Sequence, residues 1–178
     1  MLAVHSYGGA VITNAATGNP DIKALVYVDA CIPDQGETVF GLNAAQPGSC
    51  IGGDPAKTFN FVPYPGAPAE DVDLYLQTAP NPPYPGFHEC FANDLPASQA
   101  AVLAATQRPI AFSAGSAPSG PSAWKTIPSW AVIGTIDHVI PPAELLFMAK
   151  RAGARITEIR ASQPVPGLAP GGRGTGDR

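Results

Sequence analysis

Charged residues are scarce in this sequence. Asp, Glu, Lys and Arg make up only 13% of the 178 residues, and the formal net charge is −4. The chain therefore lacks the basic surface that nucleic-acid binding requires. It also lacks any apolar run approaching the ~20 residues of a membrane-spanning helix. We expect neither a nucleic-acid partner nor a membrane partner, and the composition predicts no particular oligomeric state.

Cysteine is also rare, and its count is odd. Cys31, Cys50 and Cys90 fit no disulfide framework and no zinc-ligand spacing. We therefore expect free thiols in a reducing cytoplasm and no bound metal. No basic leader follows Met1, which agrees with a cytoplasmic protein. The alternative is a Cys50–Cys90 bridge in a secreted parent protein whose signal peptide is hidden by a shortened N-terminus.

Near both ends of the chain, the pattern of apolar residues predicts alternating strands and helices. Hydrophobic residues make up 45% of the chain, enough to bury the core of one domain. Small residues ending in Gly-Asn-Pro predict a helix within residues 8–20, and the apolar run 24–28 predicts a buried parallel strand. Near the C-terminus the pattern predicts a strand at 129–134, a helix at 142–152 and a strand at 155–159. The fold class is α/β with a mostly parallel sheet.

The middle of the chain differs in composition from its ends, because it is rich in proline and aromatic residues. We call residues 33–121 the cap segment. Its prolines argue against a central strand, so we expect only short helices, at 69–78 and 96–106. Residues 163–178 are about half proline and glycine, and we expect a disordered tail after a domain spanning residues 1–162.

The motif His5-Ser6-Tyr7-Gly8-Gly9 places a serine between a short strand and a helix. Such a serine can be held in a strained turn that projects its hydroxyl, provided that its neighbours are small. The backbone N–H of Tyr7 would then stabilise an oxyanion at the helix N-terminus. Because Val4 stands where such motifs carry a glycine, an ordinary helix-capping serine is the alternative.

Three long stretches strengthen the catalytic interpretation. They resemble, in order, bacterial α/β-hydrolase-fold proteins of the small serine esterase type, and the resemblance covers nearly all of residues 2–162. It implies a partial α/β-hydrolase fold with about four strands, flanking helices and an inserted Pro-rich cap. It also implies cleavage of a small apolar carboxylic ester without a cofactor. The stretches are VHSYGGAVITNAATGNPDIKALVYVDACIPDQGET, FHECFANDLPASQAAVLAATQRPIAFSA and SAWKTIPSWAVIGTIDHVIPPAELLFMAKRAGARITEIRAS.

The resemblance also assigns roles to individual residues. Ser6 matches the nucleophile of a Ser–His–acid triad, and Asp137 matches the acid that orients the histidine. Asp29, at the end of a predicted strand, is a lesser candidate for the acid, its alternative being an ordinary loop residue. The base histidine is missing, because Gln163 stands near its expected position.

The chain's three histidines do not replace the missing base. His5 adjoins the serine and points away in this motif, His138 follows the acid in a loop, and His88 lies in the cap segment. We therefore keep two alternatives to an active esterase: a catalytically inactive fragment or pseudo-hydrolase, and a lyase- or peroxidase-type member of the fold.

The sequence also suggests hypotheses for the two ends of the chain. A frameshift near residue 163 would account for the lost histidine. At ~30 residues per βαβ unit, roughly 80 residues of strands and helices would be missing before Met1.

Overall fold

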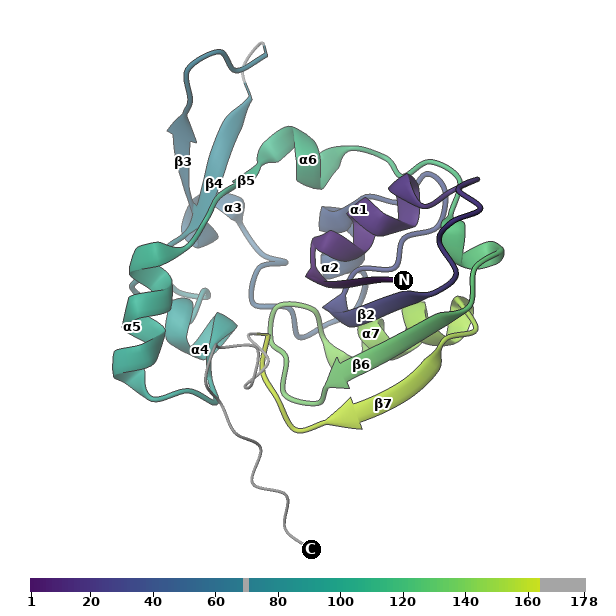
Figure 1. Cartoon of the computed structure of the whole chain (residues 1–178). Helices are drawn as coiled ribbons and strands as arrows, with labels where there is room; N and C mark the ends of the chain where they lie inside the picture. The colour runs from purple at the N-terminus through teal and green to yellow at the C-terminus, as the bar shows by residue number, and fades with distance from the viewer. Residues whose placement is uncertain (69–70, 164–178) are drawn as a thin grey trace, which may run out of the picture.

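The computed structural model describes residues 1–68 and 71–163. Its main sheet has four parallel strands in the order β1-β2-β6-β7, which confirms the predicted α/β class and strand number. Figure 1 shows much of the cap segment, residues 55–68 and 71–111, lying to one side of this sheet. The predicted tail, residues 164–178, lies outside the described residues. The strands are β1 (Leu2–Ser6), β2 (Leu25–Ala30), β6 (Ser129–Gly134) and β7 (Arg155–Ile159).

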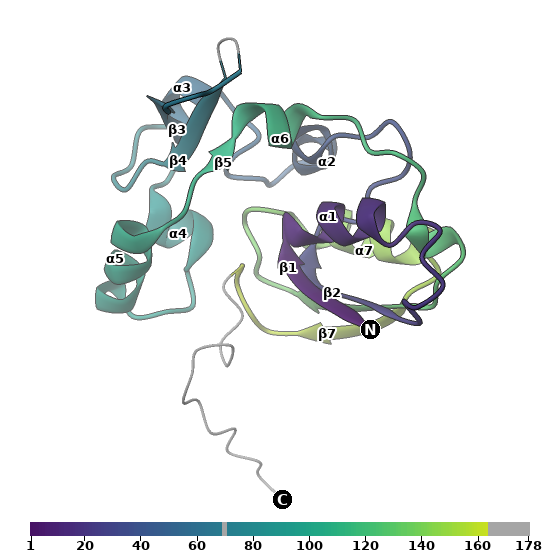
Figure 2. The same cartoon turned by 45° about the horizontal axis from the view of Figure 1, so that its top comes forward.

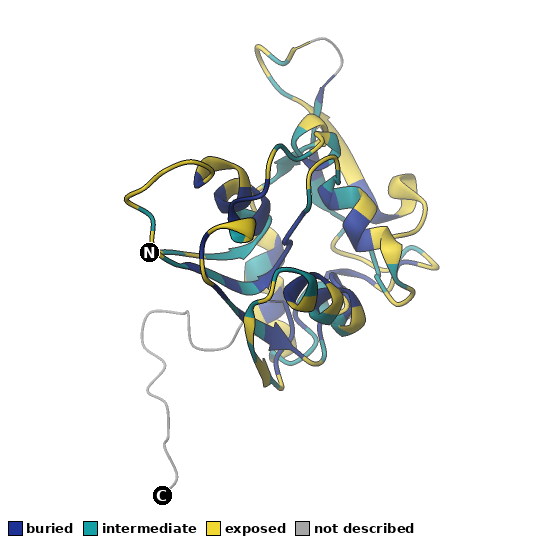
Figure 3. Ribbon diagram, turned by 90° about the vertical axis from the view of Figure 1, so that its right-hand side faces the viewer, coloured by how far each residue is buried: buried dark blue, intermediate teal, exposed yellow. Residues whose placement is uncertain are grey.

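Two helices pack on this sheet. Helix α1 (Gly8–Ala15) contacts β1 and β2, and α7 (Pro142–Arg151) contacts β6 and β7. Both helices and strands carry buried residues, which Figure 3 colours dark blue along the ribbon. Parallel strands end at the same edge of a sheet, so the residues after β1, β2 and β6 meet at one edge. That edge faces the cap segment.

The cap segment contains more strand than its prolines suggested. It forms a three-stranded antiparallel sheet in the order β3-β4-β5 as well as short helices, as Figure 2 shows from a second direction. The predicted helix at 96–106 is confirmed as α5. The elements of the middle region are α2 (Val39–Ala45), α3 (Pro55–Thr58), β3 (Phe59–Pro63), β4 (Val72–Leu76), α4 (Phe87–Phe91), α5 (Ala97–Thr106), β5 (Ile110–Ala111), α6 (Phe112–Ser116) and the 3₁₀ helix η1 (Ala123–Lys125).

The helix predicted at 69–78 is wrong. Residues 72–76 form β4, because alternate side chains face opposite sides: Leu74 is buried, while Asp73 and Tyr75 are partly exposed. The prolines do not prevent pairing, since Pro63 is the last residue of the edge strand β3. Proline is tolerated at strand ends and edges, where no N–H is needed for the ladder.

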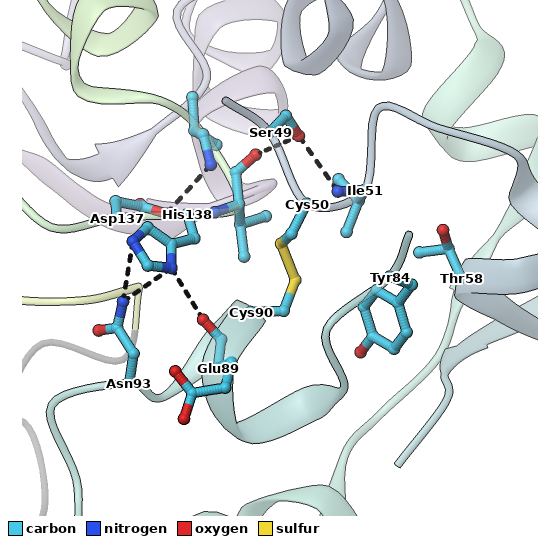
Figure 4. Close-up of a disulfide and its surroundings, with 12 residues drawn as sticks. Ser49, Cys50, Ile51, Thr58, Tyr84, Glu89, Cys90, Asn93, Asp137 and His138 are labelled. Carbon is cyan, nitrogen blue, oxygen red and sulfur yellow. Dashed lines mark hydrogen bonds between the residues drawn. A yellow bond between two sulfur atoms is a disulfide. The ribbon is translucent and has the colours of Figure 1, made fainter. Parts of the chain in front are cut away.

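The expectation of free thiols is wrong for two of the three cysteines. Cys50 and Cys90 form a disulfide, with Cα atoms 5.7 Å apart, between the loop after α2 and helix α4 (Figure 4). Cys31 is free and buried. The bridge fastens two parts of the cap segment to each other. Among the described residues no helix is long and apolar enough to cross a bilayer.

Candidate active site

Ser6 ends β1 in a left-handed backbone conformation, with φ at +52°. Left-handed backbone is costly for a residue with a side chain and is kept only where the surroundings enforce it. Here two elements do so: β1 pairs with β2 up to this point, and α1 begins two residues later. The Ser6 carbonyl also accepts a hydrogen bond from the backbone N–H of Cys31 (3.2 Å). The serine thus lies on the strained turn that the motif predicted.

Gly9 lets the helix approach the sheet closely. A β-carbon placed on this residue would lie 2.0 Å from the backbone oxygen of Cys31 and 3.0 Å from the Ala30 side chain. Any larger residue would push α1 away from β2. The glycine therefore has a steric role in forming the turn that carries Ser6.

Asp137 lies in the loop after β6 and is 1% exposed. Its Oδ1 accepts hydrogen bonds from the backbone N–H groups of Val139 (2.7 Å) and Ile140 (3.0 Å). Burial raises the pKa of this carboxyl to about 8, although the two backbone hydrogen bonds act in the opposite direction. The loop thus fixes the carboxyl in one orientation.

Gln163 lies between Ser6 and Asp137 and is fully buried. We assign its amide with the nitrogen toward Asp137, because only this orientation gives the nitrogen acceptors and the oxygen a donor. The amide N–H groups then donate to both carboxyl oxygens of Asp137, and the amide oxygen lies 2.7 Å from Ser6 Oγ and accepts from it. The three side chains form one chain of hydrogen bonds, with an amide in the central position.

Two neighbouring contacts hold the Gln163 segment in place. The backbone carbonyl of Gln163 is 2.6 Å from His5 Nε2. A carbonyl can only accept, so this nitrogen carries the proton. The preceding residue, Ser162, donates both its backbone N–H and its hydroxyl to the carboxylate of Asp94 in the cap segment. Sequence reasoning missed both contacts, because neither is signalled by spacing or pattern.

The other two histidines lie away from the serine. His138 faces the carbonyl of Glu89 and the side-chain amide of Asn93, as Figure 4 shows. His88 Nε2 is 2.9 Å from the carbonyl of Leu95, within the cap segment. Within the described part of the chain, neither of them makes a hydrogen bond to Ser6 or Asp137.

Asp29 is a second buried carboxyl at the same edge of the sheet. It is the penultimate residue of β2, with φ at +39°, and is fully buried. Its Oδ1 accepts from the backbone N–H of Gly134, whereas Oδ2 has no partner among the described residues. Burial raises its pKa to about 6. Its side chain makes no hydrogen bond to Gln163 in the described structure, so the geometry favours Asp137 over Asp29 as the carboxyl paired with residue 163.

A cavity of about 530 Å³ opens beside the serine. His5, Ser6 and Tyr7 line it from the sheet side, and aromatic and aliphatic side chains of the cap segment line it from the opposite side. Cys31 also reaches it, but burial raises the pKa of this thiol to about 12, so the thiolate is not formed near neutral pH. The apolar members of the wall include Phe40, Phe59, Leu74, Phe87, Phe91 and Leu103.

The similarity to known proteins agrees with this geometry. The profile described as "Alpha/beta hydrolase family" matches residues 2–172. No protein of curated function is detectably similar in sequence. Among solved structures, the fold resembles a pyrethroid hydrolase from Sphingobium faniae (21% identity, TM-score 0.58), an extracellular α/β-hydrolase from a Paenibacillus species (20%, 0.56) and a methylesterase from Arabidopsis (14%, 0.60).

In each of these three comparisons the alignment covers 91% of this chain. It covers 60–63% of the other chain, less than two thirds of its length. At such identities the likeness shows the fold, which is the one built above from the strands and the serine turn. With the profile match over most of the sequence, the conclusion is that the chain belongs to the α/β-hydrolase family.

Proposed function

We propose that this site cleaves small apolar carboxylic esters through an acyl-enzyme formed on Ser6. The observation that carries the proposal is the hydrogen-bonded chain from Ser6 through Gln163 to Asp137, next to a largely apolar cavity. An enzyme of this type needs a serine on a strained turn, an oriented acid and a substrate cavity together at one edge of the sheet. Similar folds carrying hydrolase or esterase names support an ester substrate.

Each residue has a defined part in the proposed reaction. Ser6 Oγ attacks the ester carbonyl. The backbone N–H of Tyr7, at the N-terminus of α1, donates to the oxygen that becomes negative, since the first N–H groups of a helix have no partner within it. Asp137 orients the side chain at position 163. In the second half of the reaction, water cleaves the acyl group from Ser6, a step that has no base to assist it while residue 163 is glutamine.

The test is to place a histidine at position 163. Gln163→His introduces a base between Ser6 and Asp137, and general-base catalysis contributes about 10²–10⁴-fold. We expect kcat/KM for p-nitrophenyl butyrate to rise by at least about 100-fold. The double variant Gln163→His with Ser6→Ala should lose that gain. A folded Gln163→His protein with no gain would contradict the proposal.

A second candidate function is ligand binding without chemistry. Gln163 itself favours this pseudo-hydrolase, because an amide cannot take up a proton near neutral pH. Such a protein would bind apolar ester analogues in the cavity and would not release alcohol from them, even with a histidine at position 163. No described contact favours the lyase or peroxidase alternative.

The disulfide bears on the compartment in which the protein works. Structural disulfides are rare in the cytoplasm and common in exported proteins. We therefore propose an oxidising compartment for Cys50 and Cys90, in place of the cytoplasm expected from the sequence. Alkylating the protein in cell extracts under denaturing conditions, which expose Cys31, and before any reduction, tests this: one labelled thiol supports the proposal, and three labelled thiols contradict it.

A further inference from the structure

Gln163 is held too firmly to be a side chain that moves out of the site. It is fully buried, and both ends of its amide are bonded, the nitrogen to Asp137 and the oxygen to Ser6. Its backbone is fixed by His5. Substrate therefore meets a serine whose hydroxyl is already bonded to an amide.

The amide orients the serine but cannot perform proton transfer. Its oxygen accepts a hydrogen bond from Ser6, yet near neutral pH it does not take up the proton. Nor does it carry an acidic proton that it could give to a departing oxygen. Gln163 thus supplies the geometry of a triad without its acid–base chemistry.

The titratable groups nearby do not replace it. His5 directs its Nε2–H toward the Gln163 carbonyl, and Asp137 is separated from the serine by the amide. Asp29 faces the backbone N–H of Gly134. None of these groups makes a hydrogen bond to the Ser6 hydroxyl in the described structure.

The two halves of ester hydrolysis depend on a base to different degrees. In acylation, Ser6 Oγ bonds to the acyl carbon, the bond from that carbon to the leaving atom breaks, and the electron pair leaves with that atom. The hydroxyl proton passes to solvent water. If the leaving group is a weak base, such as a phenolate, a thiolate or a phosphate, it needs no proton from the protein. Acylation then loses one assisted proton transfer.

Without a base, deacylation loses two assisted proton transfers. A water oxygen bonds to the acyl carbon and must give up a proton. The bond from that carbon to Ser6 Oγ breaks, and the alkoxide that leaves is strongly basic and must receive one. A histidine would perform both transfers, and each is worth about 10²–10⁴-fold. Without it, deacylation is slowed more than acylation by an activated donor.

We propose that Gln163 makes this chain a single-turnover acyl acceptor: Ser6 takes an acyl group from an activated donor, such as an aryl ester, a thioester or an acyl phosphate, and retains it. This inference rests on the proposed function of Ser6. The cavity, whose apolar wall includes Phe59, Phe87 and Phe91, provides room for a retained acyl chain.

The experiment measures acylation of the full chain by p-nitrophenyl butyrate. We expect p-nitrophenolate release in a burst of about one equivalent per chain, as for any acyl-enzyme that accumulates. Intact-protein mass spectrometry should show one added butyryl group, and peptide mapping should place it on Ser6. Ser6→Ala should show neither. In Gln163→His the adduct should decay at least about 100-fold faster, with steady turnover.

The outcomes separate this inference from the proposed function. Steady turnover by the unaltered chain that Ser6→Ala abolishes would overturn the inference and leave the esterase proposal standing. Turnover by Gln163→His, with no acyl adduct on the unaltered chain, would also overturn the inference and leave the esterase proposal standing. If neither protein reacts, although both unfold cooperatively on heating, then both proposals fail. Peptide mapping on the unaltered chain decides the site even if Ser6→Ala does not fold.

Discussion

His5 Nε2 donates a hydrogen bond to the backbone carbonyl of Gln163, 2.6 Å away. Burial lowers the pKa of His5, and the hydrogen bond opposes this effect. The histidine beside the nucleophile is therefore a neutral support for the segment that carries the amide.

This relationship predicts the effect of His5→Gln. Glutamine can place its amide nitrogen near the position of Nε2, so the hydrogen bond is kept while the titrating group is lost. We expect the rate of Ser6 acylation by p-nitrophenyl butyrate to stay within about threefold of the unaltered rate, because no proton transfer is removed. Burst kinetics measure it. A fall of 100-fold or more would identify His5 as a base.

The second prediction concerns pH. The pKa of Asp137 is raised to about 8 in the fold, whereas in the unfolded chain an aspartate titrates near 3.9. The native state thus holds a proton that the unfolded state has released. The contribution of Asp137 to the free energy of unfolding is full below about pH 4 and is lost as pH rises toward 8.

Urea denaturation at several pH values from 5 to 8 measures this dependence. In Asp137→Asn the side-chain oxygen still accepts from the backbone of Val139 and Ile140, but the titration is gone. We expect the free energy of unfolding of the unaltered chain, relative to the variant, to decrease with rising pH. A difference that is constant or increases with pH would contradict the raised pKa.

The third prediction concerns the packing of α1. Gly9→Ala places a methyl group against the backbone oxygen of Cys31, which cannot move without separating α1 from β2. We expect a loss of about 2 kcal/mol or more in the free energy of unfolding. Gly53→Ala is the matched control, since no atom lies within 4 Å of its added carbon. Equal melting temperatures for the two variants would show that the contact is not restrictive.

The fourth prediction concerns the disulfide. Cys50 and Cys90 are 40 residues apart, and closing a loop of this length removes about 4 kcal/mol of unfolded-chain entropy in the simplest model. We expect the double change Cys50→Ser with Cys90→Ser to lower the melting temperature. Reductant should lower it for the unaltered chain to a similar value and leave the variant unchanged. Insensitivity of the unaltered chain to reductant would argue against a structural bridge.

The sequence predicts the central sheet well because its two middle strands are rich in apolar residues. The apolar run 24–28 and the strand Ser129–Gly134 are visible without knowledge of the partners. The serine turn is visible for a similar reason, since its steric needs are met by adjacent glycines. In the cap segment the alternation in Val72–Leu76 is only five residues long and has prolines on both sides, so the sequence predicts a helix where the structure has a strand.

The candidate site is less predictable, because it depends on contacts between distant residues. Gln163 borders a Pro/Gly-rich stretch and looks like the start of a tail, yet contacts with Ser6, Asp137 and His5 bury it. The resemblance places residue 163 near the position of the base, but not the contacts that glutamine makes there. The Cys50–Cys90 bridge is only an alternative in the sequence, because the odd number of cysteines favours free thiols.

The Cys50–Cys90 bond also determines how damage to the cap segment would be observed. A protease cut anywhere within residues 51–89 would leave both fragments joined through the sulfur atoms. The nicked protein would migrate as one species on a gel without reductant and as two species with it. A cleaved cap segment would therefore stay attached to the domain that it covers, and its integrity can be judged only under reducing conditions.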